Sequence, residues 1–139
     1  MRAIAAALAI GLALVSPAVG TAQEQEIVVE RQVKGSAGRD IRIGVYVNMG
    51  QDCRSGPLPI IRLETAPANG RVTVKRGKLG LTNNASCLAT EVPGSVAFYR
   101  SKPDFSGVDE VTLEIKQEGG RLVRQKIKIQ IEAAGMKSI

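Results

Sequence analysis

The sequence contains no His and no Trp, and only two Tyr and two Phe occur among its 139 residues. Without imidazole, the chain has no Ser-His-Asp or Cys-His pair, no His metal cluster, and no side chain whose ordinary pKa lies near neutrality. So few aromatic rings do not make the stacking platforms that bind single-stranded nucleic acid. These absences argue against most familiar catalytic sites and against a nucleic-acid partner, and we expect no cofactor.

Long apolar runs are also lacking beyond the N-terminus. There, Arg2 gives a positive start, residues 3–15 are all apolar or small, and Pro17 follows the run. This order is typical of a secretory signal peptide. The alternative is an uncleaved anchor, but the run spans only about 20 Å as a helix, less than the roughly 30 Å of a hydrocarbon core.

Small side chains at Gly20 and Ala22 suit the positions that a signal peptidase must accommodate, so we expect residues 1–22 to be removed before Gln23. The mature chain then has the size of one domain. We expect this domain over residues 23–132 and a flexible tail over residues 133–139, in a periplasmic or secreted protein.

Only two cysteines are present, Cys53 and Cys87, and both fall in the exported part. In an oxidising compartment a lone pair most often forms a disulfide, which we expect here. A redox-active dithiol is the alternative. Catalytic pairs usually occur as Cys-x-x-Cys, however, and these two cysteines are 34 positions apart.

Apolar and polar side chains alternate along most of the mature chain, which predicts strands. The last third shows this most clearly, because two alternating runs flank Gly119-Gly120 and predict a hairpin. The stretch Arg124-Gln125-Lys126 interrupts the second run and leaves room for a bulge. We expect further turns at Ala68-Asn69-Gly70, at Gly77 to Gly80 and at Pro93-Gly94.

No stretch of the mature chain keeps apolar residues at helical spacing over ten or more positions, so we predict an all-β fold. About seven or eight short strands suit a two-layer sandwich or a small barrel. We favour a single antiparallel β-sandwich, because strict alternation gives each sheet one dry face to bury against the other.

The pattern Tyr-x-x-x-Pro-x-Phe-x-Gly-x-Asp precedes the strand over residues 111–115, and a Pro-x-x-Gly turn precedes the strand that begins near Val72. The residues are Tyr99, Pro103, Phe105, Gly107 and Asp109 in the first motif, and Pro67 and Gly70 in the second. Together they resemble the bacterial Ig-like and cadherin-like domains, over residues 65–131. The resemblance implies an immunoglobulin-like sandwich, as found in adhesins, envelope proteins and accessory domains of secreted enzymes, with structural roles for these residues.

The chain departs from that family at its possible metal ligands. Its C-terminal end has no acidic cluster of the kind that binds calcium between cadherin-like domains, and it contains no internal repeat. Asp104, Asp109 and Glu110 supply only part of the six to eight oxygens that calcium takes. We therefore expect turn and capping roles for these acids and no metal site.

Positive charge exceeds negative charge, with 19 Lys and Arg against 13 Asp and Glu and a formal net charge of +6. Two groups of cations lie near predicted hairpins: Arg71, Lys75, Arg76 and Lys78, and Arg121, Arg124, Lys126 and Lys128. If the two groups share a face, they form a cationic patch for an anionic partner. The alternative is a solvated surface whose edge lysines discourage strand addition.

Three functions follow as hypotheses. The first is an exported, non-catalytic binding module of the bacterial envelope that contacts a protein or an anionic envelope polymer. The second is a structural or accessory subunit that assembles through a sheet edge. The third is a secreted hydrolase that uses carboxylates alone, with Glu64 paired to Glu91 or Glu110.

Overall fold

The computed structural model describes residues 9–18, 20, 26–80, 87 and 91–135, and within them it contains strands and no helix. The strands are β1 (Ile27–Ser36), β2 (Ile41–Tyr46), β3 (Ile60–Thr65), β4 (Gly70–Gly80), β5 (Glu91–Ser101), β6 (Gly107–Lys116) and β7 (Leu122–Glu132). The predicted all-β fold is confirmed in this part of the chain.

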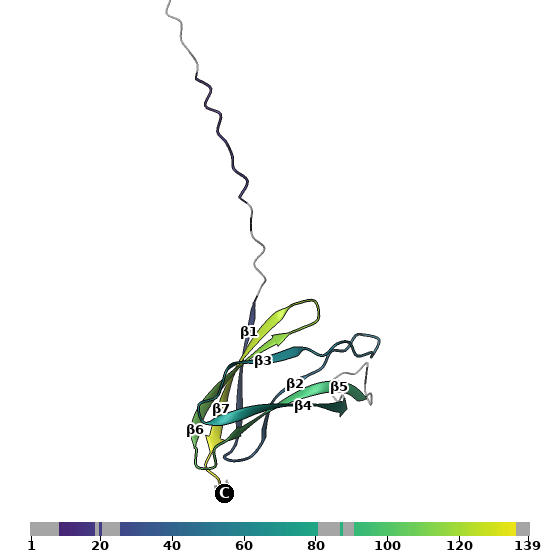
Figure 1. Ribbon diagram of the computed structural model, residues 1–139, viewed down its shortest axis with the longest axis vertical. Coiled ribbons are helices and arrows are strands. Elements are labelled where there is room, and N and C mark those ends of the chain that lie inside the picture. The colour runs from purple at the N-terminus through teal and green to yellow at the C-terminus, as the bar shows by residue number, and fades with distance from the viewer. Residues whose placement is uncertain (1–8, 19, 21–25, 81–86, 88–90, 136–139) are drawn as a thin grey trace, which may run out of the picture.

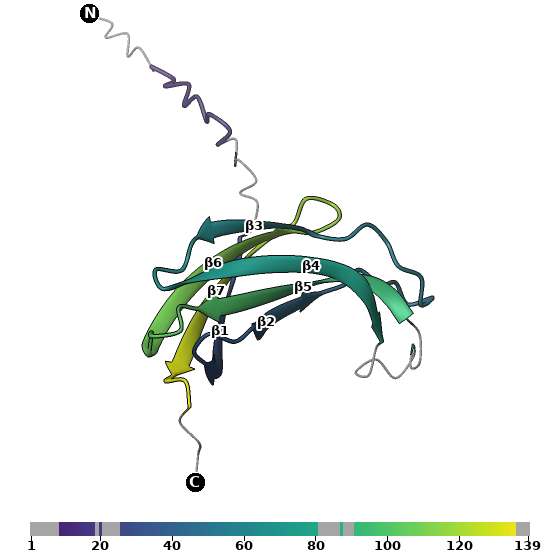
Figure 2. The ribbon, with the colours of Figure 1, turned by 60° about the horizontal axis from the view of Figure 1, so that its bottom comes forward.

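The strands form two sheets, seen in Figures 1 and 2. Sheet A has the order β1-β7-β6-β3, and sheet B has the order β2-β5-β4. Neighbouring strands are antiparallel except β1 and β7, which are parallel. The inner faces of the two sheets pack together because the inward rows of their strands are mostly apolar, so the predicted two-layer sandwich is confirmed.

The hydrophobic core lies between the sheets and is filled from alternate strand positions. β6 and β7 of sheet A contribute three aliphatic side chains each, and β2 and β5 of sheet B pack against them. These buried residues are Ile43, Ala97, Tyr99, Val111, Leu113, Ile115, Ile127, Ile129 and Ile131, each at most 3% exposed. Polar side chains at the intervening positions therefore form the two outer faces.

The interruption at Arg124-Gln125-Lys126 is not a bulge. β6 pairs with β7 along ten consecutive residue pairs without a register shift. Gln125 keeps an inward position, where its side-chain oxygen accepts a 2.5 Å hydrogen bond from the hydroxyl of Tyr46 on β2. A polar side chain is tolerated in this row because a partner from the other sheet satisfies it. Register shifts occur instead in β2 and β3.

The turns predicted at Gly77 to Gly80 and at Pro93-Gly94 are wrong, because both stretches lie inside long strands. β4 and β5 pair continuously along eleven residue pairs. Pro93 fits in β5 because β2 pairs with β5 only as far as Ser95, so no β2 residue needs the missing N–H of the proline. Cross-strand pairing over this length outweighs the local turn preference of glycine and proline.

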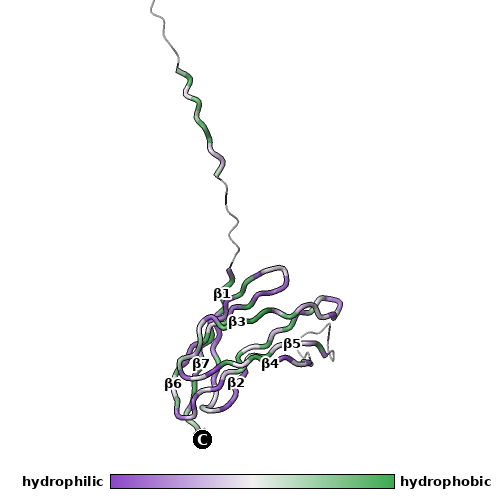
Figure 3. Tube along the Cα trace, in the orientation of Figure 1, coloured by the Kyte–Doolittle hydropathy of each residue, from purple (hydrophilic) through white to green (hydrophobic). Residues whose placement is uncertain are grey.

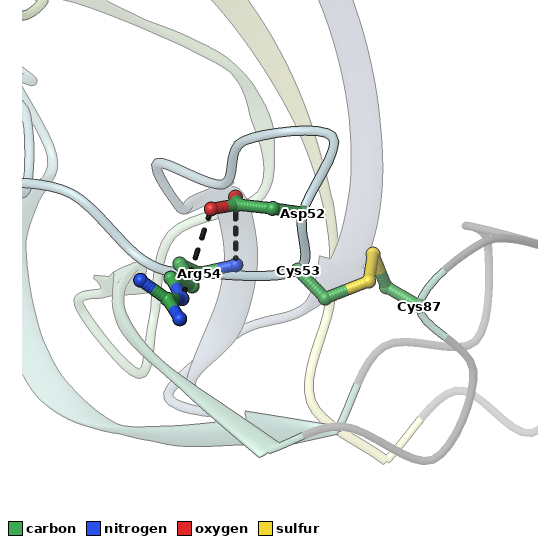
Figure 4. The surroundings of a disulfide bond; sticks show 4 residues. All are labelled: Asp52, Cys53, Arg54 and Cys87. Atoms are coloured by element: carbon green, nitrogen blue, oxygen red, sulfur yellow. Dashed lines mark hydrogen bonds and ion pairs between the residues drawn. A yellow bond between two sulfur atoms is a disulfide. The ribbon is translucent and has the colours of Figure 1, made fainter.

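The predicted disulfide between Cys53 and Cys87 is present, with Cα atoms 5.5 Å apart. It joins the connection that follows β2 to the connection that follows β4, and its surroundings are drawn in Figure 4. Asp52, beside it, accepts a 3.2 Å hydrogen bond from the backbone N–H of Arg54 and forms an ion pair with that side chain. The covalent bond thus ties together the ends of the two edge strands of sheet B.

Residues 9–18 lie outside the sandwich, and Figure 3 shows their apolar character on the segment that leads away from β1. Ile10, Leu12 and Leu14 are each more than 80% exposed. The predicted cleavage between Ala22 and Gln23 lies outside the described residues, as does the end of the predicted tail. In the part of the chain that the structure describes, no helix is long and apolar enough to cross a membrane.

Candidate binding surface

Asp109 on β6 connects the two sheets at one end of the sandwich. It is 4% exposed, and both of its carboxylate oxygens accept hydrogen bonds. The hydroxyl of Tyr99 on β5 donates one at 2.7 Å, and the backbone N–H groups of Ala68 and Asn69 donate one each at 3.0 Å. The turn that starts at Pro67 and the motif around Tyr99 therefore meet at one buried carboxylate.

Two glycines of the motifs shape the same corner. Gly70 begins β4 so close to β5 that an added Cβ would lie 2.5 Å from the carbonyl oxygen of Arg100 and 2.7 Å from the ring of Tyr99. Gly107 begins β6 with a φ of 127°, a conformation that favours glycine. The remaining motif residues lie in the connection between β5 and β6: Pro103, and a half-buried Phe105 that packs against the core.

Hydrogen bonding keeps Asp109 ionised. Burial by itself would raise the pKa of this carboxyl, but the hydrogen bonds from Tyr99 and from the backbone N–H groups of Asn69, Ala68 and Glu110 outweigh burial and lower the pKa below its ordinary value. Burial, together with the bond to Asp109, raises the pKa of the Tyr99 hydroxyl. The Asp109 carboxylate therefore stays charged while the Tyr99 hydroxyl stays protonated and donates to it. The geometry of this pair suits a structural role at the corner of the sandwich.

The three glutamates of the hydrolase hypothesis are divided between the sheets: Glu64 and Glu110 lie on the neighbouring strands β3 and β6 of sheet A, and Glu91 lies on β5 of sheet B. Glu64 accepts a 2.6 Å hydrogen bond from Arg124. Glu110 lies beside Lys128 in the register of β6 and β7, whereas Glu91 belongs to sheet B. Among the described residues, no three His, Cys, Asp or Glu side chains are grouped so that they could hold a metal ion. The geometry favours ion pairing over catalysis for Glu64.

The two basic groups lie in different sheets. One is on β4 of sheet B and the other is on or just before β7 of sheet A. The β4 group is Arg71, Lys75, Arg76 and Lys78, and the β7 group is Arg121, Arg124, Lys126 and Lys128. The eight cations therefore do not form one continuous patch, and each sheet has to be considered separately.

The outer face of sheet A carries both signs of charge. Its four strands contain seven cations and six acids. The strand register places Glu30 beside Lys126 and Glu110 beside Lys128. Arg124 forms ion pairs with Glu26 and Glu64. A hollow of about 680 Å³ on this face has the same mixed lining, so the face has little excess charge to attract an ion of either sign.

Sheet B differs, because its three strands contain six cations and a single acid, Glu91. Four of these cations alternate with inward positions of the strands and so face outward. They are Arg42 on β2, Arg71 and Lys75 on β4, and Arg100 on β5. Asp40, just before β2, accepts a 2.9 Å hydrogen bond from Arg100. This outer surface therefore carries an excess of positive charge.

Apolar side chains lie among these cations. The ammonium of Lys75 is 5.3 Å from the centroid of the Phe98 ring, within the range of a cation–π contact. Val45 on β2 is 45% exposed. We call this surface the cationic face and define it by Arg42, Val45, Arg71, Lys75, Phe98 and Arg100.

A hollow of about 470 Å³ lies at one end of the cationic face. Arg71, Arg100 and Lys102 contribute its positive charge, and Gly38, Gly70, Ser101 and Pro103 complete its lining. The buried Ser101 hydroxyl accepts a 3.1 Å hydrogen bond from the backbone N–H of Gly38, which fixes that part of the wall. An anionic group bound in this hollow would lie among three cationic side chains.

Four members of the cationic face were not found from the sequence: Arg42, Val45, Phe98 and Arg100. Alternation along β2 already indicates that Arg42 faces away from the core. Its position in one row with Phe98 and Thr73 depends on the strand order β2-β5-β4, which local pattern does not contain.

No protein-family model matches this sequence, and no curated protein matches it. A solved structure described as "Solution Structure of Amebosin" shares 8% sequence identity with it. The match covers 78% of this chain and 99% of that chain, with a TM-score of 0.44. A likeness at that level carries no argument, so the cationic face has to be interpreted from its own geometry.

Proposed function

We propose that this protein is an exported, non-catalytic binding module of the bacterial envelope, and that its cationic face binds an anionic partner. The observation that carries the proposal is the contrast of charge between the sheets: six cations and one acid in the strands of sheet B, against seven cations and six acids in those of sheet A. Such an excess attracts anions and speeds their association.

Export is supported by the disulfide and by the exposed apolar segment before the sandwich. Expression of the full chain in a Gram-negative host tests it. We expect a periplasmic product whose N-terminal residue, measured by mass spectrometry, is Gln23. Cytoplasmic material with its leader intact would contradict export.

The Ig-like type of the sandwich is also part of the proposal. The division of strands into β2-β5-β4 and β7-β6-β3 matches the two sheets of Ig-like domains, while β1 joins the second sheet through its parallel pairing with β7. The corner at Asp109 supports the same assignment, because it unites both motifs of the resemblance. An experimental structure in which β6 or β7 pairs with a strand of sheet B would contradict it.

Binding to a polyanion tests the cationic face. We expect the mature protein to bind dextran sulfate in isothermal titration calorimetry, with an affinity that falls as salt rises. The double variant Arg71→Glu/Lys75→Glu should weaken binding at least about tenfold, because it reverses two of the four outward cations.

A matched control keeps the net charge equal. Lys126→Glu/Lys128→Glu makes the same change in charge on sheet A, and we expect it to weaken binding by less than about threefold. Equal losses for the two double variants would mean that dextran sulfate responds to net charge alone, and the assignment to the cationic face would fail.

A further inference from the structure

β4 is a free edge of sheet B. It pairs with β5 along its whole length, and no other described strand pairs with it. In an antiparallel pair, successive residues direct their backbone N–H and C=O groups to alternate sides of the strand. About half of the backbone groups of β4 therefore point away from β5, where they are available to a further strand.

The other edge strands are less suited to accept a partner. β2 and β3 have six residues each, and each contains a register shift, which twists an edge away from regular pairing. β1 has ten residues and contains one acid, Glu30, with two cations. β4 has eleven residues, no proline and no register shift, so it is the longest regular edge among the described strands.

The side chains along β4 indicate what a partner strand would contain. Arg71 and Lys75 lie on the outer face, in the positions that alternate with inward-facing Val72 and Val74. Val74 is 42% exposed although it faces the core side. Leu63, in the inner row of β3 opposite buried Leu113, is likewise 46% exposed.

The sandwich is thus incompletely covered along the side that β3 and β4 border. β1 and β2 pack together at the other side, and β3 and β4 are the remaining edges of the two sheets. A strand added to β4 would direct alternate side chains toward the cations of the outer face and toward the exposed Val74. Arg76 and Lys78, on the inward row farther along, add positive charge to the same edge strand.

We propose that the free edge of β4 accepts an extended, acidic segment of another polypeptide as a fourth strand of sheet B, with acidic side chains over Arg71 and Lys75 and an apolar side chain over Val74. This proposal rests on the proposed function, because the cationic face supplies the attraction. It goes further by naming the partner as a polypeptide and its binding as β-strand addition.

A second copy of this chain is a poorer occupant of the edge. Antiparallel pairing of two β4 strands would set four cations of one copy along four of the other, and like charges opposite one another destabilise a strand pair. Lysines on an edge discourage this self-pairing while leaving an acidic strand free to bind.

A peptide of about eight residues that alternates Glu and Val, capped at both ends and labelled with a fluorophore, is the probe. We expect fluorescence anisotropy to show binding at low salt, and hydrogen exchange to show slower exchange of β4 amides in the complex. A peptide of the same length that alternates Lys and Val should not bind, because it repels the cationic face.

The decisive control is a pair of peptides with the same sequence and charge that carry N-methyl groups on alternate residues. One peptide is methylated at the odd positions and the other at the even positions, because only one of these sets donates hydrogen bonds to the sheet. Both N-methylated forms are therefore prepared. We expect one of them to bind at least about tenfold more weakly than the parent peptide, because it cannot donate to the edge. If both N-methylated peptides bind like the parent, strand addition is wrong, while binding of dextran sulfate would still support the cationic face.

Proline substitution in β4 removes a backbone N–H from the protein, as N-methylation removes one from the peptide. Thr73→Pro and Val74→Pro remove N–H groups that point to opposite edges, so only one of the two disrupts the ladder with β5. We expect the variant that keeps its melting temperature to lose peptide binding at least about tenfold and to keep binding dextran sulfate.

Retained peptide binding in the variant with an unchanged melting temperature would overturn the proposal. So would a dimer in light scattering that the peptide dissociates, because the occupant of the edge would then be a second copy. If dextran sulfate and the peptide both fail to bind the unmodified protein, the proposed function fails together with the inference.

Discussion

Sheets A and B share one core, but their outer surfaces differ in the balance of charge. On sheet A, acids and cations lie next to one another across strands, and Arg124 is bonded to two glutamates. On sheet B, the register sets Arg71 beside Arg100, and Asp40 is the acid that reaches Arg100. The comparison teaches that one outer face satisfies its own charges, while the other leaves positive charge for an external partner.

The largest expected effect comes from releasing the edge strands of sheet B. The double variant Cys53→Ala/Cys87→Ala should lower the free energy of unfolding by about 4 kcal/mol, because the unfolded chain is no longer constrained by the bond. Urea denaturation measures this loss, and hydrogen exchange should locate early opening in the edge strands β2 and β4. Equal acceleration of exchange in sheet A would break the comparison, since the bond would then support both sheets alike.

Next in size is the link between the sheets at Asp109. We expect Asp109→Ala to lower the free energy of unfolding by about 3 kcal/mol, because the Tyr99 hydroxyl and two backbone N–H groups lose their acceptor in a buried corner. Asp104→Ala, at an exposed acid in the connection that precedes β6, is the matched control and should change stability by less than about 0.5 kcal/mol. Similar losses in the two variants would remove the special role of Asp109.

The pH dependence of stability tests the same link more finely. The pKa of Asp109 is lower in the folded chain than in the unfolded chain, so its contribution is present above the unfolded value of about 4 and disappears as the pH falls through the folded value. Urea denaturation at a series of acidic pH values should show this loss. In Asp109→Asn the acid loss should be shallower, and parallel curves for the two proteins would contradict the assignment.

The smallest effect sharpens the comparison between the outer faces directly. Arg71→Glu should raise the free energy of unfolding by about 0.5 kcal/mol, because it replaces a like-charge pair with Arg100 by an opposite-charge pair. Lys126→Glu should lower it by about 0.5 kcal/mol, because it sets two acids together at Glu30. Thermal denaturation at low salt should show stability changes of opposite sign for the two variants, and high salt should reduce both changes. Stability changes of the same sign would contradict the contrast between the outer faces.

Much of the molecule was predictable because the relevant signals are local. Alternation in β6 and β7 indicated which side chains are buried, and the presence of a lone pair of cysteines indicated the disulfide. Asp109 was expected to have a turn or capping role, and it accepts backbone N–H bonds at a corner. Each of these inferences depends on neighbours in the sequence or on the chemistry of one residue type.

The failures occur where distant strands override local preference. Gly77 and Pro93 favour turns by themselves, yet eleven cross-strand pairs hold both stretches extended. Gln125 interrupted the alternation, but the hydroxyl of Tyr46, 79 positions away, satisfies it in the inner row. Neither partner is visible from a window of the sequence, because both are set by strand order.

The sequence by itself determined that the chain forms alternating strands and, where a strand is unbroken, which side faces the core, since a period of two is a property of the single extended chain. In β2 a register shift turns Val45 outward and Tyr46 inward, which alternation alone does not predict. Only the tertiary structure decided which strands become neighbours. That choice brought glutamates to the cations of β7, whereas on β4 it set Arg71 beside Arg100 and the other three cations beside uncharged residues. Lateral pairing joins segments whose separation in sequence is far greater than any local pattern spans.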